Sequence, residues 1–434
     1  MVVMRQTGPP TLRLLGRVVD ARPDELRPLL LSVTYFFCLL CGYYILRPLR
    51  EEMGIAGGVE NLPWVFTATF AAMVAAVPVF GWITTRFPRR IFLPGVYVFF
   101  ILNLLVFFVA FRSELHREWS ARVFFVWLSV FNLFVVSVLW SFMVDLYTNE
   151  QGRRLFGVIA AGGSIGAVVG PSLTAALARP IGPVNLLLIS AAFFAVAVGC
   201  IAALLRIEPR ADSAARETPL RGDVLDGITA LVRSRYLLGI ALFVIGLTVV
   251  ATFVYFEQAY IVRRALRDSG ERTAFFARID LAVNTIALLV QTLGTGRLVG
   301  WFGLTPVLAL APLASVVGLV ALGARPMLDV LAGFQVLRRS GDYALTRPAR
   351  EVLFTVVARS EKYRAKNAID TLVYRGGDAL GGWLFAGLMA LGLGLSGLAY
   401  VGAVVAACWC ALALWLGRVE QRRAKDASPA SRSR

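Results

Sequence analysis

The chain has 434 residues, of which 58% are hydrophobic and 16% charged, and its mean hydropathy is +0.71. This composition excludes a soluble globular domain and predicts an all-α polytopic membrane protein. The net charge of +17 reflects 44 Lys and Arg against 27 Asp and Glu. Because basic residues concentrate in loops that stay in the cytoplasm, the excess does not indicate nucleic acid, and we expect no nucleic-acid partner.

Apolar stretches long enough to cross a bilayer predict about twelve transmembrane helices. With the N-terminus inside, roughly 27 of the Lys and Arg fall on cytoplasmic loops and about 12 on the opposite side. This asymmetry predicts a multi-pass protein of the cell inner membrane with both termini in the cytoplasm. The predicted spans are residues 29–46, 62–82, 91–111, 120–144, 155–178, 185–205, 237–257, 275–295, 304–323, 327–356, 367–390 and 395–416.

The spans group into two six-helix bundles, which is a major-facilitator-like arrangement. Residues 1–28 lack the apolar core and cleavage site of a signal peptide, and we expect a basic amphipathic lead on the inner surface. The bundles are predicted at 29–206 and 237–417. The charged segment 207–236 is expected to form a cytoplasmic linker, and 418–434 a basic disordered tail.

The cysteines all lie in apolar runs, where a free thiol behaves as a small hydrophobic group, so we expect no disulfide. Cys38 and Cys41 have CxxC spacing, but the surrounding helix offers no second pair of ligands, and His116, the single histidine, is remote. The sequence therefore predicts neither a metal site nor a cofactor.

The first span ends in a charged cluster that contains Arg47, Arg50 and Glu51. The two arginines are three residues apart and share a helix face if the helix persists through Pro48. Two interpretations are open: an anchor at the outer surface, or the wall of a polar cavity.

The loop after the second span, from Gly81 to Arg90, resembles the GxxxDRxGRR loop of the major facilitator superfamily, with Thr85 in place of Asp and Pro88 in place of the second Gly. Its basic end matches, whereas its acidic residue is missing.

Glycines of the fifth span have the G-x8-G-x3-G-P spacing of antiporters in the same superfamily. Plain helix packing accounts for such glycines equally well, because they let helix backbones approach closely. Asp145, at the cytoplasmic end of the preceding span, is either a solvated carboxylate or part of this gating region. The residues concerned are Gly157, Gly166, Gly170 and Pro171.

Five polar residues in the seventh and eighth spans are candidates for cavity positions, and each could equally lie at the rim. They are Glu257, Arg278, Asp280, Asn284 and Gln291.

The tenth predicted span contains an unusually large number of charged residues. Each charge in the middle of a bilayer costs roughly 2.5 to 3.5 kcal/mol, so such residues usually face a cavity. If the helix starts at Met327, Arg338 lies about 17 Å along it, inside a core of roughly 30 Å. The candidate substrate-binding residues here are Arg338, Arg339, Asp342, Arg347, Arg350 and Glu351, followed by Asp370 and Asp378.

Several of these stretches resemble one family, the ATP/ADP translocases of plastids and intracellular bacteria, which are major-facilitator-like antiporters. Ile45–Glu51 is similar to the family's ILRxxKD, and Leu139–Phe142 to its LFWGF stretch. Pro348–Glu351 and Lys366–Asp370 resemble PxKE and KAAID at the family's own spacing. The resemblance implies substrate-linked roles for Arg50, where the family has Lys, and for Glu51, where it has Asp.

Two departures from the family pattern concern the substrate. Asp378 stands where the family has a Lys, and Leu128 falls near the position of an acidic residue. An acid in place of a cation counts against binding of a polyphosphate, so ATP/ADP exchange itself is in question although the fold is not.

We therefore predict a secondary active transporter that exchanges a nucleotide or another small phosphorylated anion by alternating access. Clustered arginines suit phosphate through bidentate contacts. The sequence has no GxxxxGK[ST] loop and no catalytic constellation, so we expect no enzyme activity. The lipid bilayer is the expected surrounding, and a monomer the expected state. A proton-coupled carrier of another solute and a non-transporting membrane scaffold remain as alternatives.

Among these residues, Arg350 and Glu351 are predicted to line the substrate cavity, with Arg347 on the same face as Glu351. Loss of one charged contact corresponds to roughly a 30- to 150-fold loss of affinity, so Arg350→Ala is expected nearly to abolish uptake.

Overall fold

The computed structural model describes residues 21–114, 116–207, 231, 233–357 and 359–427. Most of the predicted lead and linker, and the last part of the predicted tail, lie outside the described residues. Within them the regular elements are helical, as predicted for an all-α membrane protein.

The first bundle contains the helices up to Ile207. Their runs of apolar residues form a core of their own, which includes the ring-stacked Trp127 and Phe131. The helices are α2 (Leu26–Ala56), α3 (Leu62–Arg86), α4 (Arg89–Arg112), α5 (Arg117–Leu146), α6 (Asn149–Leu177) and α7 (Leu186–Ile207), with short 3-10 turns η1 (Val59–Asn61) and η2 (Pro183–Asn185).

The second bundle begins with α9 (Arg235–Ala265), α10 (Ser269–Phe302) and α11 (Leu304–Ala324). The tenth and eleventh predicted spans are not regular helices, because each is interrupted by a π-helical turn. The tenth is built of α12 (Leu328–Gly341), η3 (Asp342–Thr346) and α13 (Arg347–Leu353), and the eleventh of α14 (Arg359–Ala368), η4 (Ile369–Val373) and α15 (Tyr374–Ala390).

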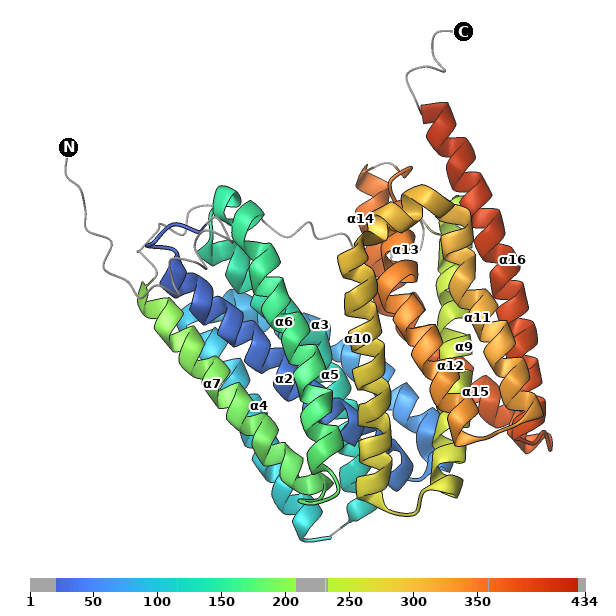
Figure 1. The fold of residues 1–434 in the computed structure, drawn as a ribbon, viewed down its shortest axis with the longest axis horizontal. Coiled ribbons are helices and arrows are strands. Elements are labelled where there is room, and N and C mark those ends of the chain that lie inside the picture. Colours follow the sequence, from blue (N-terminus) through green and yellow to red (C-terminus); the bar gives the residue numbers. More distant parts are fainter. Residues whose placement is uncertain (1–20, 115, 208–230, 232, 358, 428–434) are drawn as a thin grey trace.

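The last helix, α16 (Leu395–Ala427), corrects one expectation, since residues 418–427 of the predicted disordered tail continue it. Ten helices of the described chain are long and apolar enough to cross a membrane. The two predicted spans that do not meet this criterion are the interrupted, charged ones, which lie beside the others in the second bundle (Figure 1).

The two bundles lie side by side and diverge toward the side on which α2 begins and α16 ends (Figure 1). We call this the terminal side, where α2 begins and α16 ends, and the opposite one the far side, where α2 ends at Ala56 and α9 at Ala265. Between the bundles, α10 packs against α2 and α6, and α15 against α3.

On the far side, three ion pairs join the bundles. Arg272 of α10 binds both carboxylate oxygens of Glu52 at 2.6 and 2.7 Å, and Glu52 is fully buried. The other two pairs are more exposed, Arg263 with Glu60 at 2.7 Å and Arg179 with Glu271 at 2.5 Å. These far-side ion pairs hold the bundles together at the end opposite the chain termini.

The glycines of α6 bring that helix against α2. A Cβ atom on Gly170 would lie 2.6 Å from the carbonyl oxygen of Cys41, and one on Gly166 would lie 3.0 Å from the amide nitrogen of Cys41. Pro171 is buried beside them, whereas Gly157 is exposed and a Cβ there meets nothing within 4 Å. The close approach is thus between two helices of one bundle and does not involve Gly157.

Gly170→Leu is expected to destabilise the first bundle by about 1–3 kcal/mol or more, because the added side chain must displace the α2 backbone. A thermal unfolding scan of the purified protein measures this loss. Gly157→Leu is the matched control and should unfold at the parent's temperature. Equal unfolding temperatures for all three proteins would contradict the assigned packing.

Candidate functional site

A polar cavity of about 210 Å³ lies between the bundles, and a wider chamber of about 570 Å³ shares several lining residues with it, among them Arg47, Arg50, Arg347 and Arg375. Arg47 lies about 14 Å before the far-side end of α2, and Arg339 about 17 Å after the start of α12, at 1.5 Å per residue. Both depths place the cavity near the middle of a hydrocarbon core of roughly 30 Å.

The π-helical turn η3 determines which arginines face this cavity. Arg339 and Arg347 are eight residues apart, so in an uninterrupted α-helix they would point about 80° away from each other. A π turn holds about one residue more than an α turn and therefore rotates the following side chains by about 100° around the helix axis. The side chains of Arg339 and Arg347 then point within about 20° of each other. Both residues line the central cavity.

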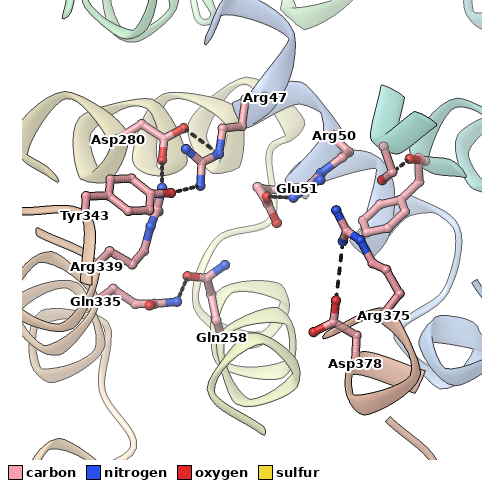
Figure 2. A network of polar contacts seen from close by, with 12 residues as sticks. Arg47, Arg50, Glu51, Gln258, Asp280, Gln335, Arg339, Tyr343, Arg375 and Asp378 are labelled. Atoms are coloured by element: carbon pink, nitrogen blue, oxygen red, sulfur yellow. Dashed lines mark hydrogen bonds and ion pairs between the residues drawn. The ribbon is translucent and has the colours of Figure 1, made fainter. Parts of the chain in front are cut away.

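Asp280 of α10 is the centre of a buried cluster on one wall. Its side chain is 3% exposed, lies 3.6 Å from Nε of Arg47 and accepts a hydrogen bond from Arg339. Arg47 also donates to the hydroxyl of Tyr343 at 2.9 Å. Figure 2 shows the side chains of Arg47, Arg339 and Tyr343 converging there. One carboxylate therefore compensates two guanidinium groups that come from different bundles.

A second polar chain lies next to this cluster. Gln335 donates to Gln258 of α9 at 2.6 Å (Figure 2). Arg338 donates to Gln335 at 2.9 Å. Within the described part of the chain, Arg338 has no carboxylate within ion-pair distance, and its Nε has no hydrogen-bond partner. Arg338 is thus a lining cation with no acidic partner among those residues.

The remaining lining arginines each face one carboxylate. Arg50 pairs with Glu51 at 2.7 Å, Arg347 with Asp342 at 3.1 Å, Arg350 with Asp370 at 3.4 Å and Arg375 with Asp378 at 3.4 Å.

Around the cavity and the chamber, seven arginines thus stand against five carboxylates, counting Asp280. The surplus of two positive charges falls on the wall formed by Arg47, Arg338 and Arg339. We call these three residues the cationic wall. Multidentate guanidinium groups of this kind suit a phosphate or carboxylate group.

Aromatic rings also line the cavity and the chamber. The guanidinium of Arg50 lies 5.0 Å from the ring centroid of Phe125, and that of Arg347 lies 4.4 Å from Tyr343. Other lining rings are those of Phe66, Phe70, Tyr255 and Tyr374.

Most predicted substrate residues meet at this site, and some lie apart. Glu351 is exposed and pairs with Lys366 at 2.5 Å, outside both cavities, and Arg347 pairs with Asp342 rather than with Glu351. Arg350 and Asp370 line the wide chamber. Asp145 is exposed at the terminal-side end of α5.

Of the candidates from the seventh and eighth predicted spans, some also lie at the site and others lie apart from it. Asp280 belongs to the cluster, and Gln291 donates to the carbonyl oxygen of Tyr343 at 3.3 Å. Asn284 instead bonds to Ala167 of α6 at 2.8 Å, and Arg278 is exposed. Glu257 is buried outside both cavities.

The polar contacts described above include four residues that were not predicted, Tyr343, Arg375, Gln258 and Gln335, and the aromatic lining residues were not predicted either. Arg375 could have been predicted from the sequence, because it is a charged residue in an apolar span, three residues before Asp378. Leu128, where the resembling family has an acid, lies buried in the core of the first bundle.

This arrangement, two helical bundles around a buried polar cavity near the middle of the membrane, defines a multi-pass membrane transporter. The family model of the Major Facilitator Superfamily matches residues 29–324. The chain belongs to the Major Facilitator Superfamily.

Similar proteins agree with this assignment. ADP,ATP carrier protein 1 of Chlamydia trachomatis is 22% identical, over 85% of this chain and 83% of its own length. ADP,ATP carrier protein 2 of Chlamydia pneumoniae is 21% identical, over 89% and 87%. The predicted resemblance to ATP/ADP translocases is thereby confirmed, as is the prediction of a secondary transporter rather than an enzyme.

Solved structures share the fold. The nucleoside transporter NupG covers 93% of this chain and 100% of its own, with a TM-score of 0.62 at 14% identity. A bacterial homologue of the iron transporter ferroportin in an inward-facing state covers 91% and 98%, with a TM-score of 0.64 at 15% identity. These likenesses confirm the major-facilitator-like fold.

Proposed function

We propose that the protein is an antiporter of a nucleotide or another small phosphorylated anion, working by alternating access. The observation that carries the proposal is the cationic wall, where two uncompensated positive charges lie near the middle of the membrane. The carriers named above, whose names specify ADP and ATP, support the nucleotide class. The aromatic rings that line the cavity provide a surface on which a base could stack.

The surplus of two positive charges at the cationic wall also indicates how many negative charges the substrate carries. Asp378 adds a carboxylate to the cavity where the resembling family has a cation, so the site compensates fewer negative charges than it would with a Lys. A phosphomonoester with about two negative charges at neutral pH fits the surplus of two more closely than a nucleoside triphosphate does.

Exchange in liposomes tests the proposal. Purified protein is reconstituted into vesicles loaded with ATP, ADP, AMP or inorganic phosphate, and uptake of each labelled compound is followed. We expect counter-exchange of at least one phosphorylated anion, with AMP or phosphate exceeding ATP. Transport driven only by a proton gradient would favour the proton-coupled carrier, and absence of any flux would favour the scaffold.

We further propose that the terminal side faces the cytoplasm of a cell with an inner membrane, so that this conformation is open inward. The loop charges support this orientation. Exposed described positions on the two sides serve as probes of this orientation.

A cysteine at Glu361, near the start of α14, should resist a membrane-impermeant maleimide in intact cells, whereas one at Ser113, after α4, should react. Permeabilised cells serve as the control, because both positions should then react. Labelling of both positions in intact cells, or a reversed pattern, would refute the orientation.

A further inference from the structure

One buried acid takes no part in the site described above. The side chain of Glu257 on α9 is 0% exposed, and neither of its carboxylate oxygens has a hydrogen-bond partner in the described part of the chain. A charged carboxylate without partners is strongly unfavourable in an apolar interior, so this burial favours the neutral form of the group.

No charged group of the described residues lies within hydrogen-bond distance of the Glu257 carboxylate. Arg264 lies two turns further on the same face, and Asp329 lies at the start of α12. Two neighbouring charges are already paired across the bundles, Arg263 with Glu60 and Arg272 with Glu52. The helix α11 has no charged residue, and those of α15 and α16 lie toward the terminal side.

Glu257 nonetheless lies close to water on one side. It is about 12 Å before the far-side end of α9, on the same helix face as Ile261 and Arg264. Both of those residues line a far-side pocket of about 630 Å³ together with Asp329 and Leu395. The pocket thus begins one helical turn from the buried carboxyl group.

On its other side, Glu257 adjoins the central cavity. The next residue, Gln258, lines that cavity and accepts the hydrogen bond from Gln335 (Figure 2). Gln335 in turn accepts a hydrogen bond from Arg338. A change in the charge of Glu257 would therefore act on α9, which carries Gln258. Gln258 is connected through Gln335 to Arg338 of the cationic wall.

We propose that Glu257 is a proton-binding site, neutral in this conformation and exchanging its proton with the far side through this pocket. Loading transfers one proton from water in the pocket to a carboxylate oxygen, and unloading returns it to water. Because the charged form needs a polar partner, unloading requires a movement of α9 that brings Glu257 toward the pocket and Arg264. The conformation is thereby coupled to pH, whichever solute the cavity carries.

Infrared spectroscopy of the purified protein tests the protonation directly. At neutral pH, the difference spectrum between the parent and Glu257→Gln should contain the C=O stretching band of one protonated carboxyl group. Glu118→Gln, which replaces an exposed acid on α5, is the matched control and should retain the band. A parent spectrum from which Glu257→Gln removes no such band would overturn the proposal.

Distance measurement tests the coupling. Spin labels at Arg153→Cys and Glu361→Cys report the separation of the bundles on the terminal side, with Cys408 and Cys410, the cysteines that are not buried, replaced by Ser. We expect the distance distribution of the parent to shift between pH 8 and pH 5, and Glu257→Gln to keep the low-pH distribution throughout. A parent that does not respond to pH, or a variant that responds as the parent does, would refute the coupling.

Neither measurement uses a transported solute. A failure of anion exchange in liposomes would therefore leave the infrared and distance results to decide the role of Glu257 on their own.

Discussion

Replacing Arg339 with alanine is expected to weaken binding of the transported anion by roughly 30- to 150-fold, which corresponds to the loss of one charged contact of about 2–3 kcal/mol. Arg339 shares Asp280 with Arg47, so its removal also leaves that carboxylate fully compensating Arg47. The positive surplus of the cationic wall falls from two charges to one.

Binding of AMP, ATP and inorganic phosphate to the purified protein, measured by calorimetry, checks this expectation. Arg339→Lys should give an intermediate loss, because an ammonium group cannot reproduce the bidentate contact of a guanidinium. Arg278→Ala, which removes an exposed arginine of α10, should bind as the parent does. If Arg339→Ala also binds all three anions with parental affinity, the cationic wall does not hold the substrate.

The same experiment examines Arg350. Its pair with Asp370 lies in the wide chamber, away from the cationic wall. If Arg350→Ala loses as much affinity for the anion as Arg339→Ala does, the bound anion contacts both the central cavity and the wide chamber.

Arg272→Ala is expected to shift the conformational equilibrium away from far-side closure by a factor of about 10² to 5 × 10³. The variant leaves Glu52 as an unpaired buried charge, and breaking a buried ion pair in this way typically costs about 3–5 kcal/mol. The cost falls only on conformations in which the bundles meet on the far side, because opening that side hydrates Glu52.

Spin labels at Ser113 and Arg325, exposed far-side positions on different bundles, would measure the change. The distance between them should increase in Arg272→Ala. A double variant with glutamine in place of both Glu52 and Arg272 should largely restore the parental distance, since it removes both charges. Arg22→Ala, which breaks an exposed pair with Glu150 on the terminal side, is the control. An unchanged distance in Arg272→Ala would show that this pair does not hold the far side closed.

Composition and periodicity were sufficient to predict the class of fold, because a membrane-spanning helix needs little more than a long apolar run. They failed where the span carries charge. Residues 327–356 read as one continuous helix, and the π turn at Asp342–Thr346 has no apolar signature that would reveal it. Without that turn, the faces of Arg339 and Arg347 could not be assigned correctly.

The site itself was predicted as a set of charges rather than as an arrangement. Asp280 and Gln291 were candidates with no partner, since their contacts to Arg47 and Tyr343 join segments far apart in the sequence. Arg350 and Glu351 were placed in one cavity because the resembling family keeps a basic and an acidic residue at this spacing and because Arg347 lies four residues before Glu351. Neighbouring residues on a helix point about 100° apart, however, and Glu351 faces Lys366 instead.

The far-side ion pairs differ in how they respond to ionic strength. Arg263–Glu60 and Arg179–Glu271 have side chains 37–61% exposed, and at physiological salt the screening length is about 8 Å, so dissolved ions weaken both. Arg272–Glu52 is shielded from those ions by its burial. Added salt therefore weakens the two exposed ion pairs but leaves the buried Arg272–Glu52 pair largely unchanged. Raising the ionic strength lowers the free energy of opening the far side only by the contribution of the two exposed pairs.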